Sequence, residues 1–464
     1  MKLINQLLNN QLNFLERLSL LLFGILPISL VMGNAAININ ILLIDLLFLI
    51  YCFKYKVWSW LKKDIFLYLI VLYIFLNLNS LFSYFILFEN QTKPFWLNDV
   101  LTFYNDDIVL KFYENDGIIR SFLFIKFILL VFAFSFLLND NKVLNLVHKS
   151  WLLIIIILIF DVFFEKFTGR NIIGYVSPDP SRIVSFFKDE MVVGAFIFCF
   201  GYASSTYFIN NQKKGKSILP IMLIFLLIPL SIFVTGEKSN FLKSILVFFT
   251  IIYFLKKNKQ FLNFKVLIIT IFCLISCFLI FSKNTHTKYS ETYMRIFEEL
   301  PILNSKPGAV QSEEESIKKS IWNNLIKIKY FAHYDAALGI LKNYPITGIG
   351  NKNFRIECFK EKYYNKKILH SHSRCSTHPH QIHFEILSEQ GILGYFMILT
   401  FIIWFSIKNI KISLKNRNIY HLSNTAYLMV FFVPLLPGGG IFNTFGGALF
   451  WVIFSLINLD YEKK

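Results

Sequence analysis

The stretch that decides the fold class is IFLYLIVLYIFLNLNSLFSYFI at residues 65–86, which contains no charged side chain. A transmembrane helix needs about 20 mostly apolar residues to cross the hydrocarbon core of a bilayer. Residues 65–86 meet this requirement, and comparable apolar runs recur along the chain. The stretch therefore predicts a helix that spans a membrane.

The composition agrees with a membrane protein. Hydrophobic residues make up 55% of the chain and charged residues 16%, with a mean hydropathy of +0.54. A soluble domain is about 45–50% apolar and about 25% charged. The net charge of +18 raises nucleic-acid binding as a possibility, but the basic residues fall mainly between apolar runs. We therefore expect membrane lipids, and no nucleic acid, around this protein.

Twelve segments have the apolar character expected of membrane helices. They are Leu18–Met32, Ile37–Phe53, Ile65–Ile86, Ile118–Leu138, Trp151–Phe164, Met191–Ile209, Ile218–Val234, Phe241–Leu255, Phe264–Phe281, Phe384–Ile407, Tyr420–Leu436 and Ile441–Ile457. Together they predict an all-α integral membrane protein of about twelve transmembrane helices.

The charges in the connections predict the orientation. Lysine and arginine cluster after the second, fourth, sixth, eighth and tenth segments, at Lys54, Lys56, Lys62, Lys63, Lys142, Lys149, Lys213, Lys214, Lys216, Lys256, Lys257, Lys259, Lys408, Lys411, Lys415 and Arg417. Basic loops face the cytoplasm. We therefore predict a bacterial inner-membrane protein with both termini cytoplasmic and residues 282–383 on the periplasmic side.

This topology divides the chain into three parts. Residues 1–281 would hold the first nine helices, residues 282–383 a periplasmic loop or cap, and residues 384–464 the last three helices. Within the cap, residues 316–343 have helical apolar spacing. The cap is therefore predicted to be largely helical.

Five of the nine histidines lie between residues 370 and 383, namely His370, His372, His378, His380 and His383. Pro379 suits the first turn of a helix whose N-cap residue would be Thr377 or Ser376. This arrangement would place His380 at the start of the tenth membrane helix and His383 one turn later on a similar face.

Three interpretations of these histidines remain open. They are ordinary interfacial side chains, or a zinc site formed by His378, His380 and His383, or a site in which His380 is a general base. Glu385 and Glu389 follow on the same predicted helix, where they would be able to orient a histidine.

The sequence THPHQIHFEILSEQGILG at residues 377–394 resembles the motif of the O-antigen ligases and O-antigen polymerases. That motif has a histidine and a glycine separated by ten residues, which here are His380 and Gly391. Residues 235–242 (TGEKSNFL), residues 336–355 and residues 161–194 resemble further segments of this family. They occur in the family's order and on the predicted outer face.

The resemblance implies glycosyl transfer without a metal or another cofactor. The donor would be a glycan on undecaprenyl diphosphate, and the acceptor lipid A-core or a second lipid-linked glycan. His380 would remove the proton of the acceptor hydroxyl. The remaining residues that the resemblance implicates are Arg182, Lys238, Arg355 and His378 for diphosphate or substrate binding, and Gly391, Glu190 and His383 in support.

One of these positions departs from the family pattern, because Lys238 stands where arginine is usual. Arginine binds a phosphate through two parallel hydrogen bonds, whereas lysine acts as a point charge. Each cation also has an alternative structural role. Lys238 would extend its ammonium group to the membrane surface from a helix end. Arg182 would pair with Asp189 or Glu190. Arg355 would pair with Glu357.

Two cysteines of the polar segment, Cys358 and Cys375, precede the motif histidine. Disulfides persist in oxidising compartments such as the periplasm. We therefore predict a disulfide between them, worth about 3 kcal/mol in the chain-entropy model.

Two alternative functions stay open from the sequence. The nearest is an O-antigen polymerase, which would join lipid-linked repeat units. A lipid or glycan transporter belongs to a different class and would be expected to show inverted repeats and interrupted helices. We find no internal repeat in the sequence.

Overall fold

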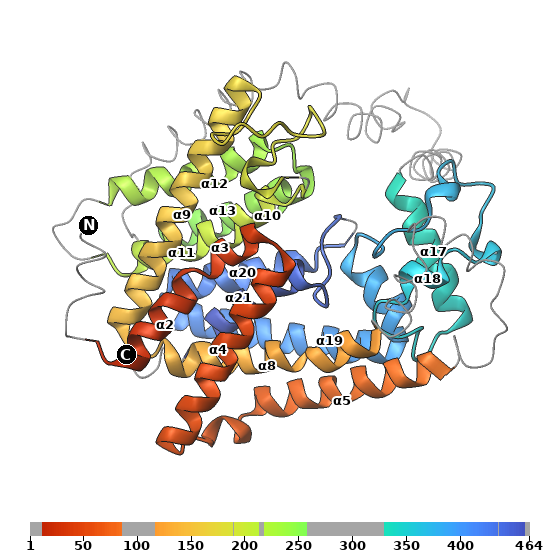
Figure 1. The fold of residues 1–464 in the computed structure, drawn as a ribbon, viewed down its shortest axis with the longest axis horizontal. Helices are drawn as coiled ribbons and strands as arrows, with labels where there is room; N and C mark the ends of the chain where they lie inside the picture. Colours follow the sequence, from red (N-terminus) through yellow and green to blue (C-terminus); the bar gives the residue numbers. More distant parts are fainter. Residues whose placement is uncertain are drawn as a thin grey trace, which may run out of the picture.

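The computed structural model describes residues 12–85, 117–188, 190–212, 218–257, 329–434 and 436–459. Every regular element in these ranges is a helix. The predicted all-α class is therefore confirmed (Figure 1).

The helices before the cap have the following bounds. They are α2 (Phe14–Gly24), α3 (Leu26–Met32), α4 (Asn34–Tyr55), η1 (Ser59–Lys62), α5 (Asp64–Tyr84), α8 (Ile125–Leu137), α9 (Asn141–Thr168), η3 (Ser185–Phe187), α10 (Val193–Phe196), the π-helical turn η4 (Ile197–Gly201), α11 (Tyr202–Asn210), α12 (Leu219–Val234) and α13 (Lys238–Lys257).

The rest of the described chain forms the cap and the last helices. The cap contains α17 (Lys329–Asn343), α18 (Phe354–Glu357), η7 (Glu361–Tyr363) and η8 (Ser371–Ser373), and it is followed by α19 (Ile382–Lys415), α20 (Ile419–Phe431) and α21 (Thr444–Ile457). The first half of the predicted cap helix, residues 316–328, lies outside the described residues.

Of the twelve predicted membrane segments, the ninth (264–281) lies outside the described residues, and each of the others overlaps a helix. Among the described residues, 7 helices are long and apolar enough to cross a membrane. The chain is thus an integral membrane protein. The total of about twelve spans, the position of the termini and the periplasmic side of the cap remain predictions.

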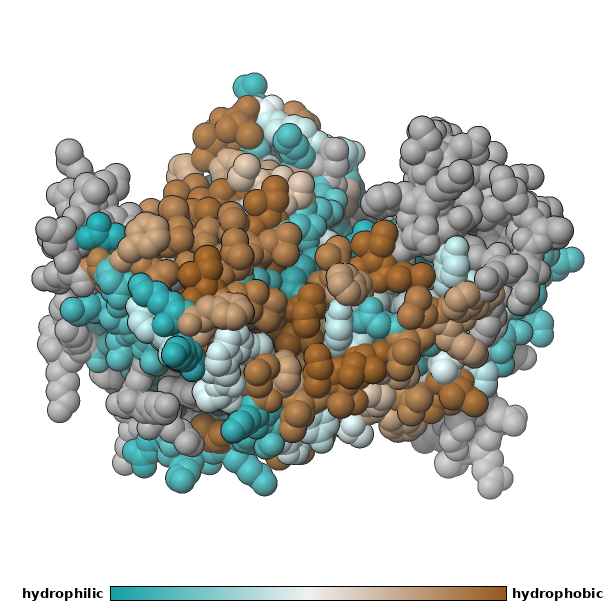
Figure 2. All heavy atoms as spheres, turned by 60° about the horizontal axis from the view of Figure 1, so that its bottom comes forward, coloured by the Kyte–Doolittle hydropathy of each residue, from teal (hydrophilic) through white to brown (hydrophobic). Residues whose placement is uncertain are grey.

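The outer surface of the helix bundle is apolar, as expected for contact with lipid. On α5, for example, Leu67, Val71, Ile74 and Leu78 are each more than half exposed. Figure 2 shows apolar side chains extending in a broad band across one face of the molecule. Exposed apolar area costs about 25 cal/mol per Å² in water, so this band is stable only in a lipid environment.

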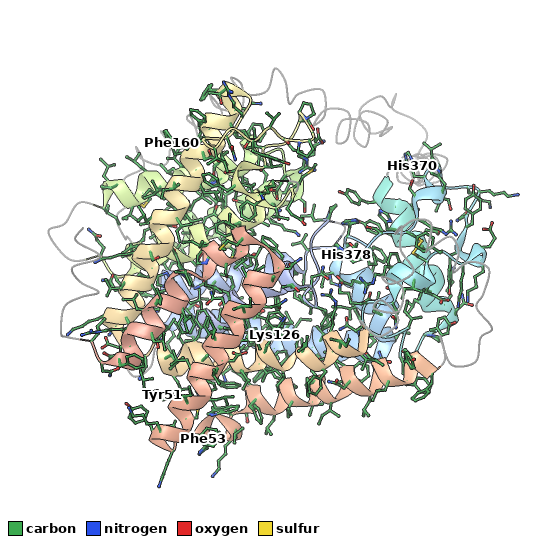
Figure 3. All side chains as sticks on the ribbon, viewed as in Figure 1. Tyr51, Phe53, Lys126, Phe160, His370 and His378 are labelled. Carbon is green, nitrogen blue, oxygen red and sulfur yellow. A yellow bond between two sulfur atoms is a disulfide. The ribbon has the colours of Figure 1, made fainter. Side chains whose placement is uncertain are left out.

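The interior of the bundle is packed with aromatic rings. The Trp451 ring on α21 lies 5.2 Å from Phe124 and 5.0 Å from Phe450, and all three side chains are buried. Lys126, which the sequence places mid-helix, donates a 2.6 Å hydrogen bond to Asn38 on α4 (Figure 3). This lysine therefore has a structural partner inside the bundle.

The helix α19 is interrupted at Gly391, where the backbone has φ +64°. Residues 345–350 fill the break, because Ile392 N–H donates to Pro345 O (2.8 Å) and Gly350 N–H donates to Glu389 O (2.8 Å). A Cβ atom at Gly391 would come within 2.6 Å of Gly348 N. The motif glycine thus lets the cap bind directly to the backbone of α19.

Candidate active site

The helix that carries the histidine motif begins later than predicted. Gln381 is its N-cap, and the Gln381 side chain accepts hydrogen bonds from the N–H groups of His383 (2.7 Å) and Phe384 (3.2 Å). His380 has φ +58°, in the left-handed region, so it cannot belong to the helix. The predicted start at Pro379 is therefore wrong.

The predicted helix N-cap at Thr377 or Ser376 is wrong for the same reason. The Ser376 hydroxyl instead hydrogen-bonds to Nε2 of His380 at 2.9 Å, and the Thr377 hydroxyl to Nδ1 of His378 at 3.1 Å. Both hydroxyl groups thus orient histidine rings that lie before the helix.

His383 does not share a helix face with His380. Its Nδ1 lies 3.0 Å from the Tyr395 hydroxyl and its Nε2 lies 2.7 Å from the carbonyl oxygen of Phe432. Both ring nitrogens are engaged, and they tie the start of α19 to the end of α20. The support from His383 is therefore structural.

The rings of His378 and His380 lie side by side, with centroids 4.4 Å apart. His380 is half-buried, and its ring also faces Tyr330 (5.4 Å) and His333 (5.3 Å) on α17. Figure 3 shows His378 where the helix bundle meets the cap, away from His370 at the outer part of the cap. The structure thus brings together two of the five clustered histidines at this junction.

His378 is held in the neutral form. Burial lowers the pKa of its imidazole to about 3, and the positive charge of Lys352 acts in the same direction, while the Gly438 backbone opposes it. Its Nε2 is buried and has no hydrogen-bond partner among the described residues. With such a low pKa this imidazole is a weak base, so His378 stays neutral near neutral pH.

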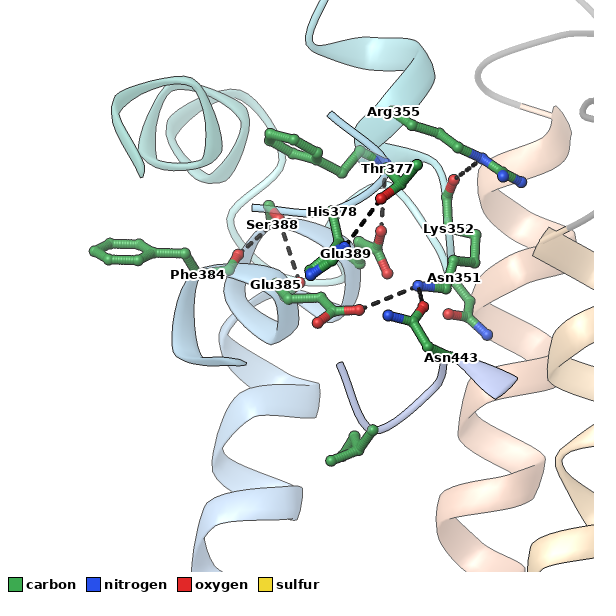
Figure 4. A network of polar contacts seen from close by, with 12 residues as sticks. Asn351, Lys352, Arg355, Thr377, His378, Phe384, Glu385, Ser388, Glu389 and Asn443 are labelled. Carbon is green, nitrogen blue, oxygen red and sulfur yellow. Dashed lines mark hydrogen bonds and ion pairs between the residues drawn. The ribbon is translucent and has the colours of Figure 1, made fainter. Parts of the chain in front are cut away.

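A buried ionic network lies beside this ring (Figure 4). Lys352 Nζ lies 3.2 Å from Glu385 Oε1, and it also donates a hydrogen bond to the side-chain oxygen of Asn443. Glu389, one turn after Glu385, accepts a hydrogen bond from the backbone N–H of Phe354 at 3.4 Å. Glu385 and Glu389 thus contact Lys352 and the Phe354 backbone, and sequence reasoning missed Lys352. That these glutamates orient a histidine stays a prediction.

A glycine-rich loop, Pro437-Gly-Gly-Gly440, closes the site from the last connection. Gly438 N–H donates to His380 O at 2.8 Å, and a Cβ atom at Gly440 would overlap both carboxylate oxygens of Glu385. The Pro437 carbonyl accepts hydrogen bonds from Lys243 Nζ (3.1 Å) and from the Ser239 hydroxyl. The run of three glycines was the sequence signal for this close approach.

The turn that carries Lys238 meets the loop that carries Arg182. Ile183 N–H donates to Thr235 O at 3.2 Å, and a Cβ atom at Gly236 would lie 3.3 Å from Cδ of Arg182. Both cationic residues are half-buried. Because Ser239, the residue after Lys238, binds the Pro437 carbonyl, this cationic turn is connected through Pro437 and Gly438 to His380.

Glu237 precedes Lys238 in the turn and is buried. Its carboxyl group accepts hydrogen bonds from Gly194 N–H (2.5 Å), Ala195 N–H (3.2 Å) and the Asn240 amide (2.5 Å). Burial raises the pKa of this carboxyl group, and the charge of Arg182 opposes that rise. Glu237 therefore anchors the turn to α10.

Acidic side chains of α9 organise the Arg182 loop. Glu165 accepts a 2.6 Å hydrogen bond from Ser185 N–H, and Asp161 accepts bonds from Ile172 N–H (2.8 Å) and the Ser185 hydroxyl. Asp161 is thus a structural residue of this loop. The supporting residue Glu190 is exposed, and Asp189 lies outside the described residues.

Arg355 hydrogen-bonds to the backbone of the turn that contains Lys352. Its Nε donates to Lys352 O at 3.2 Å, and Figure 4 shows its guanidinium group pointing away from His378. Glu357, its alternative partner, forms ion pairs with Lys360 (2.7 Å) and Lys362 (3.5 Å).

The cap is closed by a disulfide between Cys358 and Cys375, whose Cα atoms are 5.4 Å apart. Arg374, next to this bond, donates from Nε to Cys358 O at 2.8 Å. The zinc interpretation finds no support, because no three His, Cys, Asp or Glu side chains converge on a metal position in the described ranges.

A comparison with protein-family models identifies residues 221–399 as a match to the family described as O-antigen ligase. The match covers Lys238, the described part of the cap, His380 and Gly391. A search of curated proteins gave no significant match. This match bears out the resemblance of the motifs to the O-antigen ligase superfamily and supports glycan transfer in the membrane as a general function.

Proposed function

We propose that this protein transfers a glycan from undecaprenyl diphosphate to a lipid A-core acceptor at the periplasmic membrane surface, with His380 as the general base. The observation that carries the proposal is the hydrogen-bonded path from α13 to His380. Ser239 and Lys243 hold the Pro437 carbonyl, and Gly438 holds the His380 carbonyl. The turn that carries Lys238 is therefore connected to the loop that carries His380. The reaction needs such an arrangement, because a cation must contact the diphosphate leaving group while a base contacts the acceptor hydroxyl.

In the proposed reaction, the acceptor hydroxyl oxygen attacks the anomeric carbon of the donor sugar. The bond from this carbon to the diphosphate oxygen breaks, and its electron pair leaves with undecaprenyl diphosphate. Nε2 or Nδ1 of His380 takes the hydroxyl proton. No additional reactant is required for this balance.

Arg182 and Lys238 are the proposed ligands of the leaving diphosphate, and their charges would stabilise its developing negative charge. Arg355 and His378 are proposed at the same site. Arg182, Lys238 and Arg355 would supply the positive charge without a metal ion, and the neutral His378 would contribute a hydrogen bond.

The test is transfer by purified protein in detergent or liposomes, with a lipid-linked glycan as donor and lipid A-core as acceptor. We expect the wild type to form glycosylated lipid A-core and His380→Ala to form almost none. Full activity in His380→Ala would refute the assignment of the base. Transfer to a second lipid-linked repeat unit, with lipid A-core unmodified, would instead identify a polymerase.

The membrane side is tested independently. Lys367 is an exposed residue of the cap. A Lys367→Cys variant should react in whole cells with a maleimide that cannot cross the inner membrane, provided that the outer membrane has been permeabilised. Labelling only after lysis of the inner membrane would place the cap in the cytoplasm and contradict the proposal.

A further inference from the structure

The three residues before Thr377, namely Arg374, Cys375 and Ser376, are fastened to the cap although none of them belongs to a helix. Cys375 is bonded to Cys358, which is fully buried in the small apolar core of the cap. This covalent bond joins two positions 17 residues apart in the sequence. The segment that leads to the motif histidine is therefore tied to the cap core.

Arg374 holds the same segment through hydrogen bonds. Its Nε donates to the Cys358 carbonyl at 2.8 Å, and its Nη2 donates to the Phe359 carbonyl at 2.8 Å. The carbonyl oxygen of Arg374, which can only accept, lies 2.9 Å from Nδ1 of His333 on α17. Arg374 is buried, so these bonds are shielded from competing water. The disulfide and Arg374 thus fix the position of the next residue, Ser376.

Ser376 contacts the proposed base directly. Its hydroxyl lies 2.9 Å from Nε2 of His380. His380 has φ +58° and precedes the first turn of α19, so the helix does not fix its ring. A hydroxyl group can donate to a neutral ring nitrogen and can accept from a protonated one. Ser376 can therefore hold the ring both before and after the ring takes a proton.

We propose that Ser376 is a positioning residue of the transfer reaction, which orients the His380 ring through Nε2, and that the Cys358–Cys375 disulfide keeps Ser376 in place. This inference rests on the proposed function, in which His380 takes the acceptor proton. Ser376 acts through the ring of the base and is not assigned a contact with the substrates. Its hydrogen bond also favours the protonated ring, because hydrogen bonds to charged groups are roughly twice as strong as neutral ones.

The other groups around the His380 ring are common to the wild type and to any variant of Ser376. The titratable groups come from α17, from the histidine loop itself and from the ionic network beyond it, and they are Tyr330, His333, His378, Lys352, Glu385 and Glu389. A difference in proton uptake between the wild type and a Ser376 variant therefore reports the lost or retained hydroxyl group.

The first experiment measures kcat and the pH profile of kcat/KM for wild type, Ser376→Ala, Ser376→Thr and Ser373→Ala. In Ser376→Ala we expect kcat to fall about tenfold, because the base is less well oriented. The acid limb should move down by about 0.5 to 1 pH unit, because the protonated ring loses the stronger hydrogen bond. Ser376→Thr keeps a hydroxyl group and should restore both quantities.

Ser373→Ala, in the same segment, is the matched control and should behave as wild type. An acid limb that does not move in Ser376→Ala would overturn the proposal, whatever the rate, because a purely structural serine would leave the limb in place.

The second experiment tests the disulfide in the native chain. A phosphine reductant converts the bond to two thiols and is itself oxidised to its oxide. We expect kcat of the reduced wild type to fall about tenfold, with the acid limb displaced as in Ser376→Ala, and reoxidation to restore both. The Cys358→Ser/Cys375→Ser variant controls for other effects of the reductant, which should leave its kcat unchanged. Full activity after reduction, with both thiols detected by alkylation and mass spectrometry, would overturn the role of the disulfide.

The third experiment needs no substrate. Hydrogen–deuterium exchange at the imidazole C2 carbon, followed by mass spectrometry over a pH series, reports the titration of each histidine. His380 should titrate at lower pH in Ser376→Ala than in the wild type, and an unchanged midpoint would overturn the proposal. If purified wild-type protein transfers no glycan, the proposed function fails while this titration still decides the effect of Ser376 on His380.

Discussion

The backbone N–H of Gly438 donates a 2.8 Å hydrogen bond to the carbonyl oxygen of His380. The loop before α21 therefore sets the backbone position of the motif histidine. That loop is in turn held at Pro437 by Lys243 on α13. Three segments that are far apart in the sequence thus determine where one imidazole lies.

The first prediction concerns Lys243. Its side chain is 4% exposed and its Nζ holds the Pro437 carbonyl. In Lys243→Met we expect kcat to fall about tenfold, since small displacements of a base are costly. The measurement is steady-state transfer at saturating donor. Lys257→Met, at the exposed end of the same helix, is the control and should retain the wild-type kcat.

The second prediction separates two histidines of the motif. His380→Ala should lower kcat by about 10²- to 10⁴-fold with little change in thermal stability, because its proposed role is proton transfer. His383→Ala should show the opposite pattern, with a lower melting temperature, because both ring nitrogens of His383 are hydrogen-bonded. Equal effects of the two variants on both quantities would contradict these assignments.

The third prediction concerns the cation of the α13 turn. Lys238→Ala should lower kcat/KM for the lipid-linked donor by about 10²-fold, as expected for loss of a charge that stabilises the leaving group. Lys238→Arg should preserve or raise kcat/KM, because a guanidinium can bind a phosphate through two hydrogen bonds. The comparison is made with donor varied at fixed acceptor, and an inactive Lys238→Arg protein would argue against phosphate binding.

The fourth prediction concerns the break in α19. A methyl group at Gly391 would overlap the backbone of residues 346 and 348, and the position has a positive φ. Gly391→Ala should therefore lower the free energy of unfolding by about 3 kcal/mol. Gly439→Ala is the control, since its Cβ would meet only the Cα of Gly446 at 3.7 Å. Thermal unfolding in detergent compares the two, and equal melting temperatures would contradict the close packing.

The fifth prediction is a pH dependence of stability. The pKa of His378 is lowered from its usual value of 6.5 to about 3 in the folded protein. The unfolded chain therefore binds a proton first as the pH falls, and the His378 contribution to stability is lost progressively from about pH 6.5 toward pH 3. The melting temperature of His378→Asn should accordingly fall less between pH 7 and pH 5 than that of the wild type. Parallel curves would contradict this assignment.

The sequence was sufficient for the membrane helices and for the motif. Hydrocarbon thickness sets a minimum length for an apolar helix, so a run such as residues 65–86 identifies α5 without knowledge of its neighbours. The spacing of His380 and Gly391 is likewise visible in the amino-acid sequence alone. These features are local, and local patterns are what a single sequence displays.

The ionic network was not predictable in the same way. A lysine in a polar loop ordinarily lies in water, and nothing near Lys352 in the chain indicates its partners. Glu385 is 33 residues away and Asn443 is 91 residues away. The wrong helix start at Pro379 has a related cause, since the left-handed conformation of His380 accompanies its hydrogen bond to distant Gly438.

The interruption of α19 has a mechanical consequence. Residues 382–390 receive backbone hydrogen bonds from the cap at Ser388 and Glu389, whereas Ile392 and Leu393 donate to Pro345 and Ile346 instead of to the preceding turn of their own helix. The cap is thus hydrogen-bonded to α19 on both sides of the break at Gly391. A displacement of the cap by a bound glycan would therefore pull on the α19 backbone on both sides of Gly391, next to the loop that carries His380.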